Sequence, residues 1–390
     1  MSGWREIVVS DLVEKICVGF VGVCQKYYCN REDGVPMIRT TNLTEKGMSL
    51  DDVKYVSYDF HSKNKKSQLK KGDILVARHG DNGKACMYNL DIEANCLNAV
   101  IIRPDSMKVN PKFFLYQFNS PQVRSLIESM SSGSVQDVIN TKQISKIKLS
   151  IPPLPKQKAI AAVLSSLDDK IDLLHRQNAT LEAMAETLFR QWFVVEAGED
   201  WEDGEVGKLG DEFDFTMGQS PLGSSFNEDG IGVPMFQGNA DFEFRFPKER
   251  VYTTEPTRFA QKYDTLISVR APVGAQNMAL KKCCIGREVA AFRYKADNDC
   301  YTYTYFKLRS LMDDIKKFND EGTVFGSIGK SEFDALKTFI PPLELVTGFE
   351  KKSKPINDKV IKNCAQIRTL EKLRDTLLPK LMSGEVRVKV

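Results

Sequence analysis

Apolar and polar positions alternate with two different periods along this chain. Short alternating or apolar runs, bounded by Gly, Asn or Pro, predict β-strands at residues 73–78, 98–104, 146–153 and 264–270. Apolar residues spaced three and four apart predict helices over residues 111–130 and 300–318. Both halves of the chain therefore predict a mixed α/β fold, of the α+β kind.

A seven-residue apolar repeat begins after Pro155, in a stretch that lacks Gly and Pro until Gly198. It predicts a coiled-coil helix over residues 156–196, about 60 Å long at 1.5 Å per residue. A weaker copy runs from Phe349 to Leu381, where we expect Pro355 to delay or kink the start of the helix. The first repeat places Ile160, Leu167, Leu174, Leu181 and Leu188 at one seam position, and Leu164, Ile171, Asn178, Ala185 and Trp192 at the other.

The two heptad repeats favour a pair of antiparallel helices. If Asn178 faces Asn363, the remaining layers pair apolar residues, except for Leu167 against Arg374. An asparagine in an apolar seam costs stability unless it is paired, so this pair is expected to set the helix register. The alternative is that each helix packs only on its own lobe, but the even length and narrow seam favour the pair. The pairing predicts two lobes related by a pseudo-twofold axis and spaced by the helices.

Several short strings recur about half a chain apart, which indicates an internal repeat. The offset is 198 residues between Val35 and Val233 but 189 residues between Gly133 and Gly322, so the frame is shared while the interior has diverged. A duplicated scaffold whose two copies face different targets is expected to have this pattern. The matching strings are 33–43 with 229–240, 72–80 with 263–274, 133–140 with 322–329, and 150–155 with 339–344.

Composition narrows the class of protein. The chain has 390 residues, 42% of them hydrophobic, which is enough for two domains of ordinary size. Its longest apolar run, 159–164, is far shorter than a membrane span, and the N-terminal residues lack a signal pattern, so we expect a cytoplasmic protein. Nine cysteines without a CxxC pair and three scattered histidines predict reduced thiols and no metal site.

Charge is concentrated locally. The formal net charge is only +3, so any nucleic-acid surface must be confined to one part of the chain. Residues 61–71 hold five lysines and no acid, whereas residues 196–205 hold six acids and no base. The lysine run suits DNA phosphates, and its alternative is an ordinary solvated surface.

The sequence lacks complete versions of the motifs that would indicate an enzyme. The string GSIGKS at 326–331 is not a phosphate loop, because the position of the first required glycine holds Val324. Both Pro-Pro pairs occur as IPPL, without the polar and aromatic neighbours of an amino-methyltransferase motif, and no GxGxxG cofactor loop is present. The sequence therefore favours a non-catalytic protein over a self-sufficient methyltransferase or nuclease.

Three strings carry a resemblance to a known family: IPPLPKQKAIAAVLSSLDDKIDLLHRQNATLEAM at 151–184, TMGQSP at 216–221 and RAPVG at 270–274. Together they resemble the specificity subunit of type I restriction-modification systems, over essentially the whole chain. The resemblance implies that each of two target-recognition domains reads one half of a bipartite, asymmetric site in double-stranded DNA. The departure is the irregular string at 343–355, which ends at Pro355.

The same resemblance implies partners and an absence of cofactors. It implies two methyltransferase (modification) subunits and then motor-nuclease (restriction) subunits, with S-adenosylmethionine, ATP and Mg held only by these partners. It also divides the chain into domains. These are a first target-recognition domain at 1–154, a central helix at 155–196, a second target-recognition domain at 197–343 with an acidic linker at 197–205, and a C-terminal helix at 344–390.

Polar side chains on turns of the lobes are the candidate base contacts, because they present paired donors and acceptors. The alternatives are an ion pair of Arg78 with Asp73, one of Arg270 with Asp264, and turn asparagines that bond only to local backbone. In the first lobe the candidates are Arg39, Thr41, Asn42, Arg78, His79, Asp81 and Asn82, with Lys63, Lys65, Lys66 and Lys84 on phosphates. In the second lobe they are Gln219, Ser220, Gln237, Asn239, Arg270, Gln276 and Asn277.

Charged positions on the long helices are candidates for methyltransferase docking, with ordinary solvated charge as the alternative. They include Lys170, Asp172, His175 and Arg176. The main rival function is a coiled-coil scaffold that joins two protein-binding domains. Such a scaffold is expected to lack the salt-sensitive DNA affinity of a phosphate-contacting protein.

Overall fold

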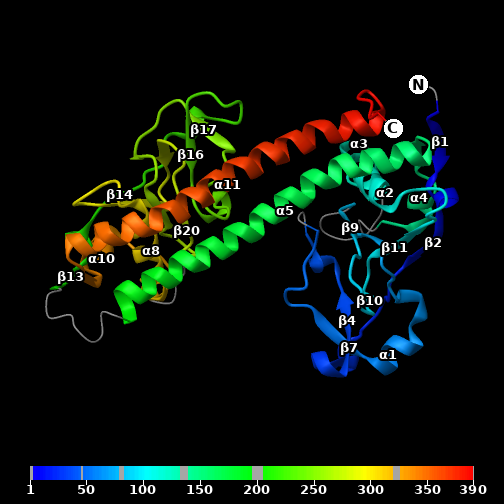
Figure 1. Cartoon of the computed structure of the whole chain (residues 1–390), viewed down its shortest axis with the longest axis horizontal. Coiled ribbons are helices and arrows are strands. Elements are labelled where there is room, and N and C mark those ends of the chain that lie inside the picture. The colour runs from blue at the N-terminus through cyan, green and yellow to red at the C-terminus, as the bar shows by residue number, and fades with distance from the viewer. Residues whose placement is uncertain are drawn as a thin grey trace. The chain divides into compact units, whose positions relative to one another are not determined.

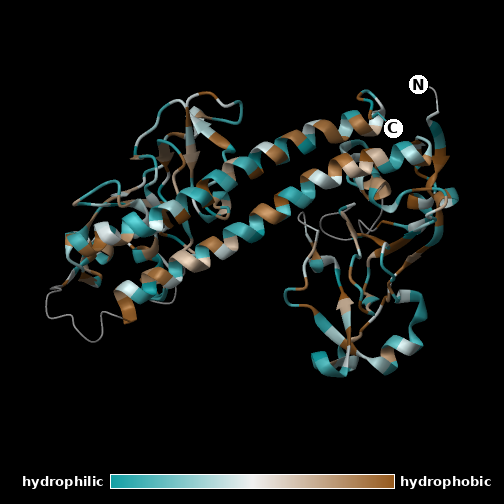
Figure 2. Ribbon diagram, viewed as in Figure 1, coloured by the Kyte–Doolittle hydropathy of each residue, from teal (hydrophilic) through white to brown (hydrophobic). Residues whose placement is uncertain are grey.

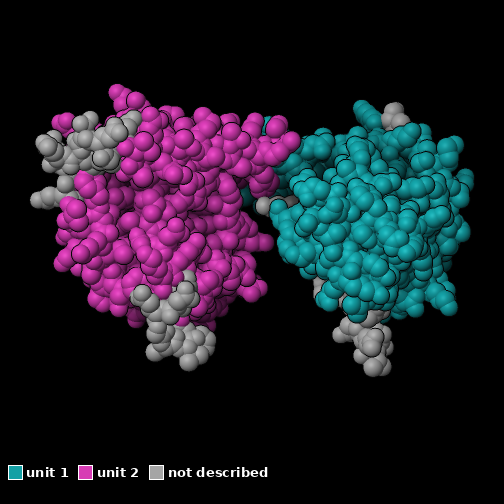
Figure 3. Space-filling view, turned by 90° about the horizontal axis from the view of Figure 1, so that it is seen from below, with its two compact units in different colours: residues 1–172, 368–390 teal, residues 173–367 magenta. Residues whose placement is uncertain are grey.

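The structure is a computed structural model that describes residues 3–44, 47–78, 83–131, 139–195, 205–318 and 326–389. The chain folds into two compact units, coloured separately in Figure 3. Unit 1 consists of residues 1–172 and 368–390, and unit 2 consists of residues 173–367. Each unit combines short strands and short helices with a part of each of two long helices (Figure 1).

Unit 1 contains two four-stranded sheets. All pairings within them are antiparallel except that of β10 with β4. The first sheet has the order β2 (Val13–Val18), β11 (Val100–Pro104), β8 (Ile74–Val76), β9 (Ala85–Met87). The second has the order β10 (Asn95–Cys96), β4 (Gly34–Ile38), β7 (Lys54–Ser57), β3 (Tyr28–Cys29). Two further pairs join β1 (Arg5–Val8) with β12 (Lys148–Ile151) and β5 (Leu43–Thr44) with β6 (Gly47–Met48).

The short helices of unit 1 follow local sequence signals. The helix predicted over 111–130 is broken into α2 (Pro111–Phe118) and α3 (Pro121–Ser131), because a proline disfavours the helical conformation at the residue before it. Asn110 caps α2 by accepting a hydrogen bond from the Phe113 amide at 3.0 Å, with Pro111 in the first turn. The other short helices are α1 (Tyr58–Lys63) and α4 (Thr141–Ser145).

Unit 2 repeats the order of the first sheet with different strands. That sheet runs β14 (Phe213–Met217), β22 (Val289–Tyr294), β19 (Thr265–Ser268), β20 (Gln276–Met278). The second sheet runs β15 (Phe226–Asn227), β17 (Val251–Thr253), β16 (Val233–Phe236), β21 (Cys283–Ile285), β18 (Phe259–Ala260), and again one pair, β16 with β21, is parallel. The remaining elements are the pair β13 (Glu205–Lys208) with β23 (Lys337–Ile340), and α7 (Leu209–Glu212), α8 (Tyr301–Ser310), α9 (Met312–Lys317) and α10 (Lys330–Ala335).

The predicted strands correspond to β8, β11, β12 and β19. Central strands β11 and β22 are apolar on both faces, because each is paired on both sides and covered on both faces. The first sheet of each unit has an ion pair at the same place. It joins an arginine of the central strand to the aspartate that immediately precedes the neighbouring strand. Asp73 binds Arg103 at 2.7 Å in unit 1, and Asp264 binds Arg293 at 2.7 Å in unit 2.

The long helices α5 (Leu154–Arg190) and α11 (Leu343–Ser383) contribute to both cores. In unit 1, Leu164 of α5 lies in one buried cluster with Leu381 of α11. In unit 2, Phe189 of α5 lies in one buried cluster with Phe349 of α11. Figure 2 shows apolar residues recurring among hydrophilic ones along both helices, as the heptad pattern predicts. None of the described helices is both long and apolar enough to cross a membrane.

The expectation that Pro355 delays the start of the second long helix is wrong. Helix α11 already begins at Leu343 and continues through Pro355. A proline removes the hydrogen bond to the carbonyl four residues earlier, here that of Lys351. Both residues are exposed, so water can bind that carbonyl, and the packing of Phe349 before the interruption and of Ile356 after it holds the helix.

Candidate nucleic-acid interface

Three segments of unit 2 meet where strands β14, β16 and β21 end. We call residues 217–221, 236–239 and 285–288 the unit 2 edge. Backbone hydrogen bonds fasten them together: the Gln219 amide donates to the Ile285 carbonyl at 3.0 Å, and the Gly286 amide donates to the Phe236 carbonyl at 2.8 Å. A Cβ atom at Gly218 would lie 2.1 Å from the Gly286 carbonyl oxygen, so the chains approach more closely than any side chain permits.

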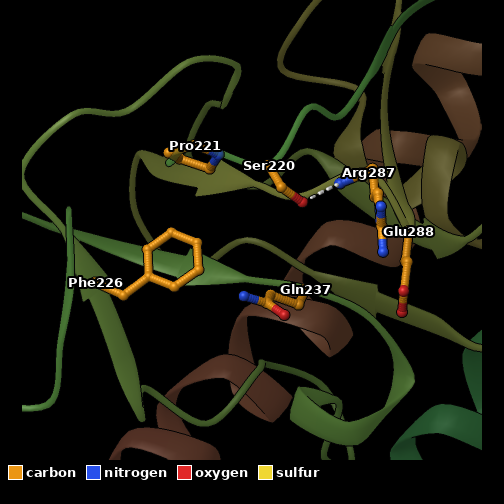
Figure 4. Close-up of a pocket in the computed structure, with 6 residues that line it drawn as sticks. All are labelled: Ser220, Pro221, Phe226, Gln237, Arg287 and Glu288. Atoms are coloured by element: carbon orange, nitrogen blue, oxygen red, sulfur yellow. Dashed lines mark hydrogen bonds between the residues drawn. The ribbon is translucent and has the colours of Figure 1, made fainter. Parts of the chain in front are cut away.

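A polar pocket of about 280 Å³ opens at this edge. Figure 4 shows Phe226 on one side of it and Arg287 with Glu288 on the other. The Ser220 hydroxyl accepts a hydrogen bond from the Arg287 amide at 3.2 Å, which joins two of the three segments. Two predicted contact residues, Ser220 and Gln237, are thus brought together, and the pocket is lined by Ser220, Pro221, Phe226, Gln237, Arg287 and Glu288.

The predicted contacts of unit 2 divide into exposed and structural residues. Gln219, Gln237, Asn239 and Arg270 are exposed, and Ser220 is half-buried. Gln276 and Asn277 do not face solvent freely. The Gln276 amide donates to the Tyr305 carbonyl at 2.6 Å, and the fully buried Asn277 donates to the Glu243 carbonyl at 2.6 Å.

The unit 1 edge has the same backbone frame, formed by residues 18–24, 38–42 and 96–99. The Phe20 amide donates to the Cys96 carbonyl at 2.7 Å, and the Leu97 amide donates to the Ile38 carbonyl at 2.8 Å. Gly19 takes the place of Gly218, since a Cβ there would lie 2.4 Å from the Cys96 carbonyl oxygen. The side chains differ: unit 1 has Phe20, Val21 and Gly22, with Val21 64% exposed, where unit 2 has its Gln-Ser-Pro string.

Some of the predicted contacts that follow β4 form hydrogen bonds within their own turn or to residues near it. Asn42 is buried and accepts a hydrogen bond from the Arg39 amide at 2.9 Å, so it shapes the turn and is not available as a base contact in this conformation. The Arg39 guanidinium donates to the Asp52 carbonyl at 2.6 Å. Hydrogen bonding to Lys54 and then to Arg39 holds the pKa of Asp52 below its usual range. Thr41 is exposed.

Arg78 does not pair with Asp73, which belongs to Arg103. Its guanidinium donates to the Ile139 carbonyl at 3.0 Å and to Asn98 Oδ1 at 3.1 Å, and burial lowers the pKa of Arg78. Arg270 likewise does not pair with Asp264, which belongs to Arg293. The predicted contacts His79, Asp81 and Asn82 lie outside the described residues, and Lys84 is half-buried.

Arg78 and Arg270 are also not equivalent positions, as the string match suggested. The Ala77 amide bonds to the Lys84 carbonyl in unit 1, and the Ser268 amide bonds to the Ala275 carbonyl in unit 2, so Ala77 corresponds to Ser268. Arg78 therefore corresponds to Val269, and Arg270 lies one residue further along its turn. The string comparison missed this shift because it aligned arginines instead of hydrogen bonds.

The lysine run of unit 1 is accessible. Lys63, Lys65 and Lys66 are exposed, and Lys63 forms a surface ion pair with Asp59 at 2.8 Å. The Lys15 ammonium donates to the Lys66 carbonyl at 2.8 Å, which adds a cation that the sequence comparison missed. Surface pairs of this kind are weak and exchange readily, so these lysines can bind phosphates.

A buried charge network links helix α5 to the loops of unit 2. Glu182 on α5 forms ion pairs with Arg245, at 3.3 Å, and with Arg309. Arg245 is 1% exposed, and its guanidinium lies 3.9 Å from the centre of the Tyr305 ring. The Arg245 carbonyl accepts the Met278 amide at 2.9 Å, which connects the segment after Asn239 with strand β20. Helix α5 is thereby fastened to the segments that carry the predicted contacts.

The long helices carry polar pairs within each unit. In unit 2 the Asn363 amide donates to Asn178 Oδ1 at 2.9 Å, and both residues are buried. In unit 1 Arg374 binds Asp168 at 3.1 Å, so the arginine that fitted poorly against Leu167 has a carboxylate next to that position. Of the predicted docking residues, Asp172 and Arg176 are exposed, and Lys170 and His175 are half-buried.

Comparison with known proteins identifies the family. The profile described as "Type I restriction modification DNA specificity domain" matches residues 1–183 and 199–359. The chain belongs to this family. The putative type I restriction enzyme MjaX specificity subunit of Methanocaldococcus jannaschii is 30% identical over 99% of this chain and 94% of its own length. Because the family is defined by DNA specificity, the role of this type I specificity subunit is DNA recognition.

Two further comparisons extend over the whole chain. The type I restriction enzyme HindI specificity subunit of Haemophilus influenzae is 22% identical over 99% of this chain and all of its own length. The crystal structure of the type I restriction-modification S subunit from M. genitalium has a TM-score of 0.63 and 17% identity, covering 97% of this chain and 96% of that one. At that identity the likeness concerns the fold, which agrees with the mixed α/β content and the long helices.

The sequence comparison missed the residues of each edge that do not lie in a repeated string. Arg287 and Glu288 follow strand β21 after Gly286, and Val21 and Val23 follow β2. The available signal was the glycine at each strand end, since Gly19, Gly218 and Gly286 mark where the backbone segments approach closely. The residues next to such glycines are the ones whose side chains the backbone frame places at the edge.

Proposed function

We propose that units 1 and 2 each read one half of a bipartite, asymmetric site in double-stranded DNA, as the non-catalytic specificity subunit of a type I restriction-modification complex. The observation that carries this proposal is the pair of edges, which share a backbone frame but differ in side chains. Two domains that recognise different DNA sequences can share a backbone frame but need different side chains, because side chains at the groove edges read base identity.

The proposed contact set keeps most of the predicted base and phosphate contacts. Asn42, Gln276 and Asn277 are left out because their side chains are bound within the fold. In unit 1 the proposed base contacts are Arg39, Thr41, Arg78, His79 and Asn82, with Lys63, Lys65, Lys66 and Lys84 on phosphates. In unit 2 the proposed base contacts are Gln219, Ser220, Gln237, Asn239 and Arg270.

We further propose that the duplicated halves follow a pseudo-twofold repeat, with α5 and α11 as an antiparallel coiled-coil pair that sets the spacing of the half-sites. The Asn178–Asn363 hydrogen bond supports the proposed register. The proposal keeps the four domains at 1–154, 155–196, 197–343 and 344–390, although most of the acidic linker lies outside the described residues. Lys170, Asp172, His175 and Arg176 are the proposed docking positions for two methyltransferase subunits.

The register has its own test. Asn178→Ala is expected to cost about 1–2 kcal/mol of unfolding free energy, because it leaves the buried amide of Asn363 without its partner. Replacing both asparagines by leucine is expected to restore that stability while loosening the register. Chemical denaturation of the two variants checks this, and equal stability of Asn178→Ala and the parent chain would contradict the proposed pin.

The proposed partners carry the chemistry. Methyltransferase and motor-nuclease subunits would hold S-adenosylmethionine, ATP and Mg, and the chain described here would hold none of them. Its contribution is to orient the complex on one DNA sequence. The proposed complex works in the cytoplasm, where its DNA substrate is found.

The deciding experiment measures DNA binding by the complex with methyltransferase subunits. Sequencing the methylated adenines of cells that carry the gene gives the site, and a mobility-shift titration then compares that duplex with a scrambled one at rising salt. We expect preference for the site and affinity that falls steeply with salt. The rival scaffold of two protein-binding domains predicts neither, so equal weak binding to both duplexes rejects the proposed function.

A further inference from the structure

We propose that Arg287 reads a guanine, through O6 and N7 in the major groove, within the half-site of unit 2. This inference rests on the proposed function and adds the residue and the base. Arg287 is exposed at the rim of the polar pocket beside Gln237 and Ser220 (Figure 4). Within the described part of the chain its guanidinium has no hydrogen-bonding or ionic partner, whereas Arg245, Arg250, Arg293 and Arg309 are all held in ion pairs.

The backbone around Arg287 is fixed although its side chain is not. Its amide donates to Ser220 Oγ at 3.2 Å, and the preceding Gly286 amide donates to the Phe236 carbonyl at 2.8 Å. The following residue is held as well, because the Glu288 carbonyl accepts the Val269 amide at 2.9 Å. Bonds from three segments therefore place the Cα atom of Arg287, and a contact made from such a support loses less conformational entropy on binding.

The neighbouring charges favour a base over a phosphate. Glu288 lies next to Arg287 in the pocket wall, and its carboxylate repels a phosphate oxygen brought to the same place. A base edge carries no net charge, and the arginine fork matches the two acceptors of guanine, O6 and N7, which is the commonest specific contact of its kind. Gln237 across the pocket is uncharged and adds no cation that would attract the backbone.

Unit 1 provides an internal contrast. The Leu97 amide bonds to the Ile38 carbonyl as the Gly286 amide bonds to Phe236, and the Gly19 amide bonds to Ala99 as the Gly218 amide bonds to Val289. The single residue Asn98 of unit 1 therefore stands where unit 2 has Arg287 and Glu288. Asn98 is already bound, because its Oδ1 accepts the Arg78 guanidinium at 3.1 Å. The free arginine is therefore a feature of the unit 2 edge and not of the common frame.

The test replaces each guanine of the site, one at a time and on both strands, by 7-deazaguanine, which keeps base pairing but lacks the N7 acceptor. Binding is measured by mobility shift with the full chain and its methyltransferase subunits. We expect one position at which the replacement weakens binding on the order of tenfold. Arg287→Ala is expected to weaken binding to the unmodified site by a similar factor and to become indifferent to 7-deazaguanine at that position.

Two variants distinguish a guanine contact from a phosphate contact and from a general effect of charge. Arg287→Lys keeps the charge but loses the planar fork, so it should bind the site less tightly than the parent chain if the contact is to guanine and like the parent chain if it is to phosphate. Arg5→Ala removes one exposed charge from unit 1 and should leave the guanine effect unchanged. The inference is overturned if no guanine shows an effect that depends on Arg287, or if Arg287→Ala weakens site and scrambled duplex equally. If the parent complex does not prefer the site at all, the proposed function fails as well.

Discussion

The edges of unit 1 and unit 2 have one backbone frame and two kinds of surface. In both, an amide of the first segment bonds to the last residue of a short parallel strand, and a glycine permits the close approach. Yet unit 1 has Phe20 and Val21 where unit 2 has Gln219 and Ser220 beside a polar pocket. The difference shows how recognition chemistry changes without a change of fold, because the hydrogen bonds that build the edge are made by main-chain atoms.

The strongest way to challenge the common frame is to remove the arginine of each buried ion pair. Arg103→Met leaves the Asp73 carboxylate buried without its partner, and Arg293→Met does the same to Asp264. Each change is expected to cost about 3–5 kcal/mol in the unit that carries it. Urea denaturation of single-tryptophan variants measures this, since Trp4 packs on the core of unit 1 and Trp192 on that of unit 2.

Equal losses in the two units support a shared frame. A loss in one unit only, or an effect no larger than that of the exposed control Arg5→Met, contradicts it.

A glycine change tests the edge more locally. Gly218→Ala pushes a Cβ against the carbonyl oxygens of Ile285 and Gly286, and Gly19→Ala pushes one against Cys96. We expect a cost of about 2–3 kcal/mol and loss of recognition of one half-site in each case. Gly223→Ala is the matched control, because a Cβ there meets nothing within 4 Å. Normal recognition of both half-sites by Gly218→Ala would show that the edge is not where unit 2 reads DNA.

Arg78 sharpens the contrast between the units. Its bonds to Ile139 and Asn98 hold the unit 1 edge, while unit 2 has Val269 in its place. Arg78→Ala is therefore expected to weaken discrimination at one half-site on the order of tenfold and to leave the other intact. Binding to duplexes mutated in one half-site at a time gives the answer, and an equal loss at both would assign Arg78 to phosphate contact or to general stability.

The smallest expected difference is in the pH dependence of stability. Burial raises the pKa of Glu212 in unit 2 above its ordinary value of 4.5, so the folded unit holds more protons than the unfolded one between that value and the raised one. Unit 2 should therefore lose stability as pH rises through this window. In unit 1, the pKa of Asp52 is lowered, chiefly by its hydrogen bond to Lys54, and this stabilisation is lost as pH falls through the lowered value.

Single-tryptophan denaturation midpoints above pH 4.5 reveal the falling stability of unit 2, and midpoints below pH 3.8 reveal the loss in unit 1. Glu212→Gln should flatten the slope of unit 2 and leave unit 1 unchanged. Part of the slope is expected to remain, because burial also raises the pKa of Glu350. An unchanged slope in Glu212→Gln would exclude this carboxyl as its source.

The spacing of apolar residues predicted helices and strands well where the burial of one face determines which of the two forms. The strands around Ile74 and Val100 and both long helices follow from apolar spacing alone. Pro355 misled because propensity describes an isolated helix, while packing of Phe349 and Val360 decides this one. Helices and strands were therefore predictable where the burial of apolar side chains outweighs the intrinsic conformational propensity of single residues.

The site was less predictable than the fold. Polar residue types in turns do not reveal which side chains form hydrogen bonds within the fold, as those of Asn42 and Asn277 do. The Asn277 side chain donates to the carbonyl of Glu243, a contact between positions 34 residues apart, whereas Gln237 is exposed. Arg287 stood outside every repeated string, so only the convergence of three strand ends brings it to attention.

Unit 1 is assembled from two ends of the chain, since it needs residues 368–390 as well as residues 1–172. The partners Asp168 and Arg374 stand 206 positions apart. At about 5–20 residues per second, the ribosome needs roughly ten to forty seconds to make the second after the first. During that delay the apolar side chains around Leu164 lack Leu381, and a nascent chain in this state is a natural client for holding chaperones. A late premature stop is thus expected to disable the half that was synthesised first, so only complete chains can deliver a fully folded first unit.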